Sequence, residues 1–299
     1  MILKQRGIPR NLQFLSSLHA RRELTEEEER AFRSQQKGYE GEKQFDCWLK
    51  PVVKNAVVLN DLLLEQSNSV FQIDTLFMQR STIHLFEVKN VENEYYIEGD
   101  TWFSGSHQEV NNPLNQLYKT TSHFKRLLQH HRISYHVEPH LIFINPTFTL
   151  YGAPKQSPIT MYAQLPKLLE QLSVPAQVTN QELEFGNKLI DIHEKTKTII
   201  PAPEYTYDGL EKGLVCPKCC KLYPKSLGKY VTCGTCGIIE EKSVAIERAI
   251  EEFMFLFPEE KVTNRVMREW CGINSKRVIR NVLDKKLTLQ PLNKYAYYS

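Results

Sequence analysis

The sequence lacks long apolar runs. No stretch approaches the roughly 18 consecutive apolar residues that a membrane-spanning helix needs. Residues 1–10 are partly basic and hold no apolar run of signal-peptide length, so we expect a cytoplasmic protein with no membrane partner. There is also no internal repeat and no long low-complexity tract. A chain of 299 residues that is 41% hydrophobic and 24% charged is ordinary for a globular protein of two or three domains.

The chain has little excess of charge of either sign, because its net charge is only +3. The charges are unevenly distributed, however. Residues 261–299 contain nine Lys or Arg against Glu269 and Asp284, which leaves a local net charge of +7. A local excess of this size favours contact with nucleic acid over a merely solvated basic surface.

Cysteine is scarce outside one short segment. Five of the seven cysteines lie between Cys216 and Cys236. An odd number and tight clustering argue against a secreted disulfide framework and favour metal binding. The ligands we expect belong to two C-x-x-C turns separated by thirteen residues, namely Cys216, Cys219, Cys233 and Cys236.

Four thiolates at this spacing predict one tetrahedral zinc ion in a zinc ribbon. Such a site leaves no position for water, so we expect the zinc to be structural. Cys220 is left out because its use would spoil the spacing of the first turn, and a redox C-x-x-C pair would need a βαβ setting that is absent. Gly234 and Gly237 permit the positive φ that such turns often need.

Two apolar runs, residues 71–77 and 83–90, flank a short turn. They are rich in β-branched and aromatic residues and too short for helices, so we interpret them as two hairpin-paired strands. The second run is typical of a strand covered on both faces, where a charged side chain must find a partner. Glu87 and Lys89 are unexpected there. Their spacing of two places both side chains on one face, and Asp74 lies on the neighbouring strand.

Two carboxylates held together at low dielectric repel each other unless a cation lies between them, and a divalent ion with oxygen ligands suits such a place. We therefore expect Asp74 and Glu87 to bind Mg or Mn. The ammonium of Lys89 would then orient the attacking water and offset the charge that develops at phosphorus, as in metal-assisted phosphodiester hydrolysis. The alternative is a plain salt bridge between Glu87 and Lys89, with Asp74 capping a turn.

Further residues carry a resemblance to a known family. In order along the chain they are Gly38-Tyr39-Glu40-Gly41-Glu42, Asn60-Asp61, Gln72-Ile73-Asp74, Glu87-Val88-Lys89-Asn90, Trp102, and Asn112-Pro113 followed by Gln116. Over residues 36–150 the chain resembles the NERD domain, a nuclease-related domain of the PD-(D/E)xK nuclease superfamily. Many members have His or a similar residue after the first aspartate, where this chain has Thr75.

The resemblance implies an α/β, restriction-endonuclease-like core with the element order α-β-β-β-α-β and a mixed central sheet. It implies catalytic roles for Asp74, Glu87 and Lys89, a supporting role for Glu42 near the metal, and a contact of Gln116 with phosphate or metal-bound water. Without it, Glu42 and Gln116 would be read as ordinary polar residues of two helices.

The implied activity is hydrolysis of nucleic acid, DNA more than RNA, in DNA processing or repair. The alternative is a catalytically inactive nucleic-acid-binding protein that uses the zinc ribbon and the basic C-terminal helices. The presence of all three core residues, Asp74, Glu87 and Lys89, favours activity. The sequence indicates no particular oligomeric state.

Local patterns predict the remaining elements. Thr25 and Glu28 form a capping box that begins one helix, and a second helix is expected over about residues 39–49, before Pro51. The other expected elements are strands at 56–64, 70–78 and 83–89, an edge hairpin at 95–103, a helix at 113–130, a strand at 140–144 parallel to an earlier one, and helices at 165–172 and 181–195.

The C-terminal segment has the pattern of a helix-turn-helix. A helix over residues 243–257 precedes two short ones, which begin after the capping residues Thr263 and Ser275 and are joined by a turn at 271–274. The second short helix would enter the major groove of DNA. Its candidate reading residues are Asn274, Lys276, Arg277, Arg280 and Asn281. The alternative is a basic helical hairpin that packs with its charges in water.

The ribbon carries its own basic and aromatic residues, Lys218, Lys221, Lys225 and Lys229 with Tyr223 and Tyr230. They fit nucleic-acid binding and a solvated small domain equally well. We expect five parts: an N-terminal helical extension at 1–35, the nuclease-like domain at 36–150, a helical connector at 151–210 with a linker at 201–203, the zinc ribbon at 211–241, and the basic helical segment at 242–299.

Overall fold

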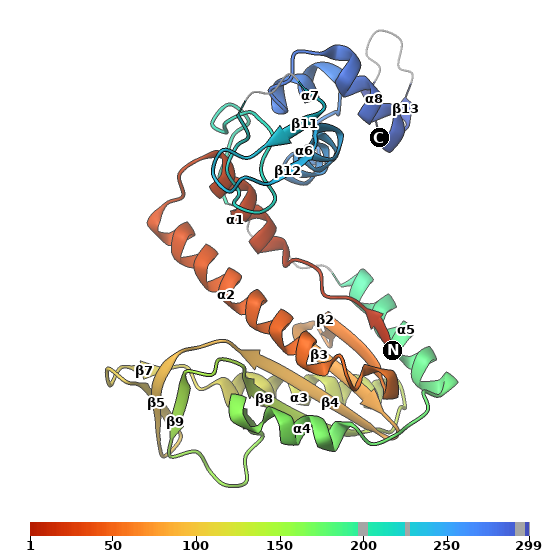
Figure 1. The fold of residues 1–299 in the computed structure, drawn as a ribbon. Helices are drawn as coiled ribbons and strands as arrows, with labels where there is room; N and C mark the ends of the chain where they lie inside the picture. Colours follow the sequence, from red (N-terminus) through yellow and green to blue (C-terminus); the bar gives the residue numbers. More distant parts are fainter. Residues whose placement is uncertain (197–202, 225–227, 291–296, 299) are drawn as a thin grey trace. The chain divides into compact units, whose positions relative to one another are not determined.

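The structure is a computed structural model that describes residues 1–196, 203–224, 228–290 and 297–298 (Figure 1). Its contacts divide the chain into two compact units. Unit 1 consists of Met1–Pro9 and Ser34–Ile200, and unit 2 of Arg10–Arg33 and Pro201–Ser299. No helix among the described residues combines the length and the apolar character that crossing a membrane requires.

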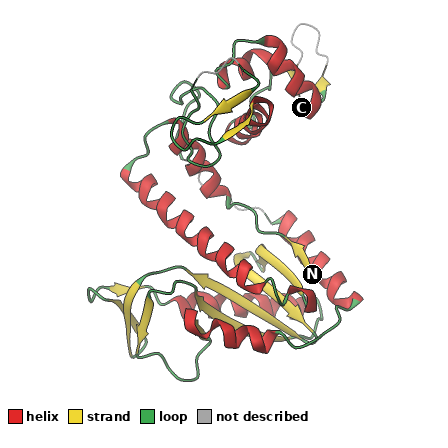
Figure 2. Ribbon diagram, viewed as in Figure 1, coloured by secondary structure: helices red, strands yellow, loops and turns green. Residues whose placement is uncertain are grey.

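Unit 1 is built on a six-stranded mixed sheet with the order β1-β2-β3-β4-β8-β10. Its strands are drawn in yellow in Figure 2. Strands β2, β3 and β4 form an antiparallel meander, whereas β8 pairs parallel to β4, as expected for a strand that follows a helix crossover. The strand bounds are β1 Ile2–Lys4, β2 Val57–Gln66, β3 Ser69–Gln79, β4 Thr82–Lys89, β8 His136–Phe143 and β10 Ile159–Met161.

Helices cover both faces of this sheet because each strand carries apolar side chains on both sides. One face packs against α3 (Pro113–His130) and α5 (Asn180–Lys195), through residues such as Phe124 and Phe185. The other packs against α2 (Glu26–Leu49) and α4 (Leu165–Leu172), through Phe45 and Leu168. The element order α-β-β-β-α-β and the mixed α/β class are thereby confirmed.

The small hairpin at residues 95–103 forms as β5 (Asn93–Glu98) and β6 (Thr101–Ser104), but not at the edge of the central sheet. It belongs to a separate sheet with the order β7-β6-β5-β9, where β7 is Glu109–Val110 and β9 is Phe148–Tyr151. The reason is a small core of its own, in which Trp102 packs with Phe143 and Phe148.

Residues 26–49 form one helix, not the two that the sequence predicted. The capping box is present, since the Thr25 hydroxyl accepts from the Glu28 amide and the Glu28 carboxylate accepts from the Thr25 amide. Between the two expected helices there is no proline, and Gly38 costs only about 1 kcal/mol of helix stability. Capping and packing at the two ends outweigh that cost, so the helix runs through.

Unit 2 has one apolar core to which helix α1, the ribbon and the C-terminal helices all contribute. Helix α1 (Arg10–Arg21) supplies Phe14 and Leu18, the ribbon supplies Leu214 and Val231, and the C-terminal helices supply many more, including Phe253, Trp270 and Leu283. Its other elements are β11 Tyr230–Thr232, β12 Ile239–Glu241, α6 Lys242–Leu256, α7 Asn264–Trp270, α8 Lys276–Lys286, β13 Leu289–Gln290 and β14 Tyr297–Tyr298.

These units differ from the expected five parts. The connector contributes β10 to the central sheet, beside β8, and buries α5 against β2, so residues up to 195 belong with unit 1. The ribbon and the C-terminal helices share one core, and β12 leads directly into α6, so residue 241 is not a boundary between compact units. Of the linker expected at 201–203, residues 201 and 202 lie outside the described residues.

Candidate active site and metal centre

Asp74 and Glu87 lie where strands β3 and β4 part. The ladder between these strands runs from Gln79 and Thr82 only as far as Thr75 and Phe86. Beyond that point β4 continues with β8, up to the pair of Lys89 and Phe143. We call this point of separation the fork. Asp74 bridges it with its side chain, because its Oδ2 accepts a hydrogen bond of 2.8 Å from the Val88 amide. The fork therefore holds both carboxylates at one place, as predicted.

Lys89 joins this pair to helix α3. Its Nζ lies 2.7 Å from Glu87 Oε1 and donates a hydrogen bond of 3.0 Å to Gln116 Oε1. Gln116 stands in the first turn of α3, where the Asn112 side chain caps the helix and Pro113 begins it. Glu87 is buried, whereas Gln116 is exposed. The lysine thus reaches from a buried carboxylate towards the open side of the site.

Burial and neighbouring carboxylates disfavour the ionised form of Asp74. Desolvation, followed by the charges of Glu87 and Glu42, raises the pKa of Asp74 well above its ordinary value, although the Val88 amide and Lys89 act in the opposite direction. Burial likewise raises the pKa of Glu42, with Arg6 opposing that shift. A divalent cation would relieve this repulsion, so the donor set fits Mg or Mn.

Helix α2 brings Glu42 to the site because it can approach the end of β4 closely. Gly41 is buried, and a Cβ at that position would lie 2.5 Å from the Asn90 Cβ. Asn90 is itself fixed, since its Nδ2 donates to the Lys37 carbonyl and its Oδ1 accepts from Asn145. Close packing of α2 against Asn90 therefore requires glycine at position 41, and any larger residue would push the helix and Glu42 away from the fork.

Arg6 is the site residue that sequence reasoning missed. Its side chain is only 3% exposed and forms salt bridges with Glu42, at 2.6 Å, and with Asp46, at 2.8 Å. One guanidinium nitrogen, Nη2, also donates to the Asp74 carbonyl and to the Thr75 hydroxyl. No local motif marks this arginine, because its partners lie 36–69 residues away in the sequence.

The five predicted site residues open into one cleft of about 570 Å³. Helix α2, the fork and the start of α3 line it. Its lining includes Tyr39, Gln72, Asn90 and Tyr95 in addition to Glu42, Asp74, Glu87, Lys89 and Gln116. The structure thus brings together, in one cleft, all five residues for which the sequence predicted a catalytic role.

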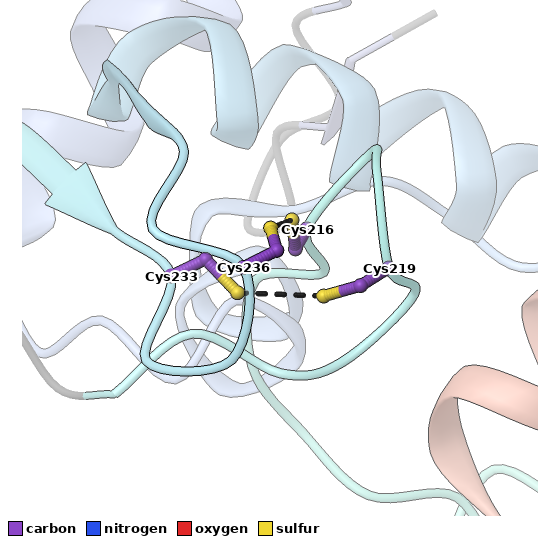
Figure 3. Close-up of side chains that lie close together, drawn as sticks. All are labelled: Cys216, Cys219, Cys233 and Cys236. Atoms are coloured by element: carbon purple, nitrogen blue, oxygen red, sulfur yellow. Dashed lines mark hydrogen bonds between the residues drawn. The ribbon is translucent and has the colours of Figure 1, made fainter.

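In unit 2 the four predicted zinc ligands converge (Figure 3). Their sulfur atoms lie within 4.8 Å of one another. The sulfur of Cys216 lies 3.6 Å from that of Cys236, and the sulfur of Cys219 lies 3.4 Å from that of Cys233. Zinc–sulfur bonds of 2.3 Å at tetrahedral angles place sulfurs about 3.8 Å apart, so these two pairs need to separate by only about 0.2–0.4 Å to hold one zinc ion. Cys220 lies outside the group, as expected.

The two knuckles have matching backbones. The Cys220 amide donates to the Cys216 carbonyl, and the Gly237 amide donates to the Cys233 carbonyl, both at 3.0 Å. The donor residue has positive φ in each case, +54° at Cys220 and +72° at Gly237. Cys220 thus occupies the place of a knuckle glycine, and Gly234, where we also expected positive φ, does not adopt it.

Backbone amides point at the cysteine sulfurs in both knuckles. The Cys236 and Thr235 amides lower the pKa of Cys233 to about 6. Burial raises the pKa of Cys216, but the Cys219 and Lys218 amides outweigh it and lower this pKa as well. Amides that stabilise thiolates prepare the sulfurs for a metal, because the thiolate is the form that binds.

The basic and aromatic residues of the ribbon differ in exposure, and Lys218 and Lys221 are exposed. Tyr223 is buried, and its hydroxyl donates to Glu240 at 2.5 Å, so its ring is not available for stacking on bases. Lys229 pairs with Glu241 at 2.9 Å. Tyr230 is exposed, whereas Lys225 lies outside the described residues.

Helices α7 and α8 form as the capping residues predicted. The Thr263 and Ser275 hydroxyls accept from the amides of Val266 and Val278, and the turn between the helices contains Gly272 at φ +64°. One side of α8 is buried through Ile279, Val282 and Leu283. All five candidate reading residues are exposed: Asn274, Lys276, Arg277, Arg280 and Asn281.

Comparison with known proteins concerns unit 1 alone. Residues 37–144 match the model of a protein family described as the nuclease-related domain, NERD. The match includes the five residues of the cleft that were predicted as catalytic and ends before unit 2 resumes. No curated protein and no solved structure matches the chain.

Proposed function

Because residues 37–144 form a nuclease-related domain, we propose that unit 1 is a divalent-metal-dependent nuclease that hydrolyses phosphodiester bonds in nucleic acid. The observation that carries the proposal is the fork, where Asp74 and Glu87 meet beside Lys89 in an open cleft. We further propose DNA as the substrate rather than RNA, in DNA processing or repair.

The charges around the fork sum to a negative value that one divalent cation would neutralise. Four carboxylates, those of Glu42, Asp46, Asp74 and Glu87, face two cations, Arg6 and Lys89. If all are ionised, the balance is −2. Asp74 and Glu87 would hold Mg or Mn, and Glu42 would support the ion from α2. When bound, the metal would polarise the phosphodiester and lower the pKa of the attacking water.

The remaining roles belong to residues that the cleft already orients. Lys89 would contact a phosphate oxygen or the attacking water, since Glu87 and Gln116 hold its ammonium at the cleft. Gln116 would accept from that water or donate to phosphate. Arg6 lies behind Glu42 and Asp74, so it would position these groups without touching the substrate.

A cleavage assay with Mg or Mn over duplex DNA, single-stranded DNA and RNA tests this proposal. Asp74→Asn and Glu87→Gln should abolish cleavage, because each removes a negative ligand of the metal, and should leave nucleic-acid binding intact. Lys89→Ala should lower turnover by about 10²-fold, which is typical when one electrostatic stabiliser is lost. Full activity in both acid variants would show that the site lies elsewhere.

We propose that unit 2 binds the substrate through the exposed residues of α8. A helix of this kind fits the major groove of B-DNA, whereas the major groove of double-stranded RNA is too deep and narrow to admit one. Lys276, Arg277 and Arg280 lie together on its exposed side, although Arg280 shares its charge with Asp284 at 3.4 Å. This favours duplex DNA as the nucleic acid bound.

Replacing Lys276, Arg277 and Arg280 by Ala together tests this surface. Each phosphate contact that is lost should reduce the slope of log K against log salt by roughly 0.9. Deleting residues 261–299 would be less informative, because Trp270 and Leu283 belong to the core of unit 2. The matched control replaces Lys167, Lys188 and Lys195, which are exposed on α4 and α5.

An unchanged salt slope in the α8 variant would mean that these helices serve packing alone. A different result would contradict the nuclease proposal: the intact chain could bind DNA tightly and cut no substrate with any divalent ion. That result would favour a nucleic-acid-binding protein whose nuclease-related core no longer acts.

A further inference from the structure

A second group of metal-type donors lies on strands β4 and β8. It consists of His84, Glu138 and His140, whose ligand atoms all lie within 4.8 Å of one another. His84 and Glu87 are three residues apart on β4, so their side chains leave opposite faces of the strand. The group is therefore separate from the candidate nuclease site.

Strand pairing produces this cluster. In the parallel ladder of β4 and β8, His84 pairs with Glu138 and Phe86 pairs with His140. Glu138 and His140 are two residues apart, so they share one face of β8. The cluster is thus part of the central sheet and does not depend on a loop conformation.

The donor atoms already face one another. His84 Nδ1 lies 3.0 Å from His140 Nε2 and 3.3 Å from Glu138 Oε2. Two ligands at about 2.0–2.1 Å from a tetrahedral zinc ion are about 3.3 Å apart. The His–Glu distance matches this value, and the two imidazoles need to separate by only about 0.3 Å.

Aromatic neighbours hold both imidazoles in place. The Phe86 ring stacks on His140 with centroids 4.8 Å apart, and Phe77 meets His84 edge-on at 6.0 Å. The side chain of His84 is 13% exposed, whereas that of Glu138 is 44% exposed. The site is therefore ordered on its inner side and open to solvent at Glu138, which gives an ion a way in.

We propose that His84, Glu138 and His140 form a second metal site, which binds one zinc ion between β4 and β8. Two imidazoles and one carboxylate are ligands that zinc prefers. The ion would cross-link the parallel strand pair and keep an open fourth position for water. This inference does not rest on nuclease activity.

Zinc titration of the full-length chain tests the site. The protein is first saturated with zinc and dialysed, so that tightly bound metal is retained, and total zinc per chain is then measured together with further uptake by calorimetry. The wild-type chain should bind one zinc more than His84→Ala or Glu138→Gln. Loss of a ligand should weaken this zinc by more than the 10–100-fold that loss of an outer partner costs.

Two further variants keep the test decisive. His107→Ala removes an exposed histidine of the same unit and should bind as much zinc as wild type. Glu138→His replaces an exposed ligand with another donor and should retain the second zinc even if truncations at His84 perturb folding. Zinc should also raise the thermal midpoint of wild type more than that of Glu138→Gln. Equal zinc content and equal thermal shifts in wild type and Glu138→Gln would overturn the proposal.

Discussion

Arg6→Met should destabilise unit 1, because it removes the cation shared by the largely buried carboxylates of Glu42 and Asp46. The arginine binds Asp46 through both Nε and Nη2, at 2.8 and 2.9 Å, and Glu42 through Nη1 at 2.6 Å. Although burial opposes it, hydrogen bonding to Asp46 and the charges of Asp46 and Glu42 raise the pKa of Arg6. The ion pairs therefore outweigh the desolvation of the guanidinium.

The magnitude follows from the exposure of the partners. Removing one member of a fully buried ion pair costs about 3–5 kcal/mol, mostly because the remaining charge stays unpaired. The side chains of Glu42 and Asp46 are 15% and 22% exposed, so water offsets part of that cost. We expect a loss of about 3 kcal/mol, at the lower end of the range.

Urea unfolding followed by tryptophan fluorescence measures this loss. A Trp270→Phe background leaves Trp48 and Trp102, both in unit 1, as reporters. The control is Arg126→Met, which removes an exposed arginine of α3 and should change stability by no more than about 0.5 kcal/mol. Adding Glu42→Gln and Asp46→Asn to Arg6→Met should recover most of the loss. If Arg6→Met unfolds at the same urea concentration as the control, the network does not stabilise the unit.

Two other predictions concern metal-free stability and zinc. With chelator present, Asp74→Asn should stabilise unit 1 by about 0.5–2 kcal/mol. The gain should grow as pH rises above about 4, because the folded-state pKa of Asp74 is raised and the wild type loses stability as that carboxyl ionises, whereas Asn does not titrate. A gain that is independent of pH would contradict this. Metal analysis should find zinc bound at the four-cysteine cluster, and Cys233→Ser should release it and destabilise unit 2 as a whole, since Cys233 belongs to that unit's core, while unit 1 keeps its stability. A Cys233→Ser protein with full zinc content would exclude this ligand set.

Local patterns in the sequence were sufficient for most elements of unit 1. Helix α3 begins and ends where Pro113 and the apolar stripe predicted, and β8 lies parallel to an earlier strand, as expected. The four-cysteine cluster was also predictable, because the spacing of the cysteines alone specifies two knuckles. These predictions share one property, which is that the signal and the structure it specifies lie within a few residues of each other.

Predictions failed where the deciding contacts are remote. Strand β10 has only three residues, and nothing within it marks it as a neighbour of β8. The ribbon looked like an independent domain because its ligands are local, yet its apolar residues pack with α1 and α7. Arg6 was invisible for the same reason, since the acids that define its role are brought to it by α2 and β3.

The break in the sheet beside the site could not be predicted from the sequence either. In β2, Val57 and Leu59 share a core with Leu62 and Leu64, so the alternation of the residues that enter this core changes phase between positions 59 and 62. In β3 the same change occurs between Ile73 and Leu76. Both phase changes fall at an aspartate, and these two residues, Asp61 and Asp74, are the position at which the ladder of β2 and β3 is interrupted. Asp61 has φ +52°, which lets the strand turn its faces over. The sequence does not reveal this change, because residues 57–59 and 62–64 are all apolar and show no alternation. Only the structure places the two aspartates at one break in the ladder.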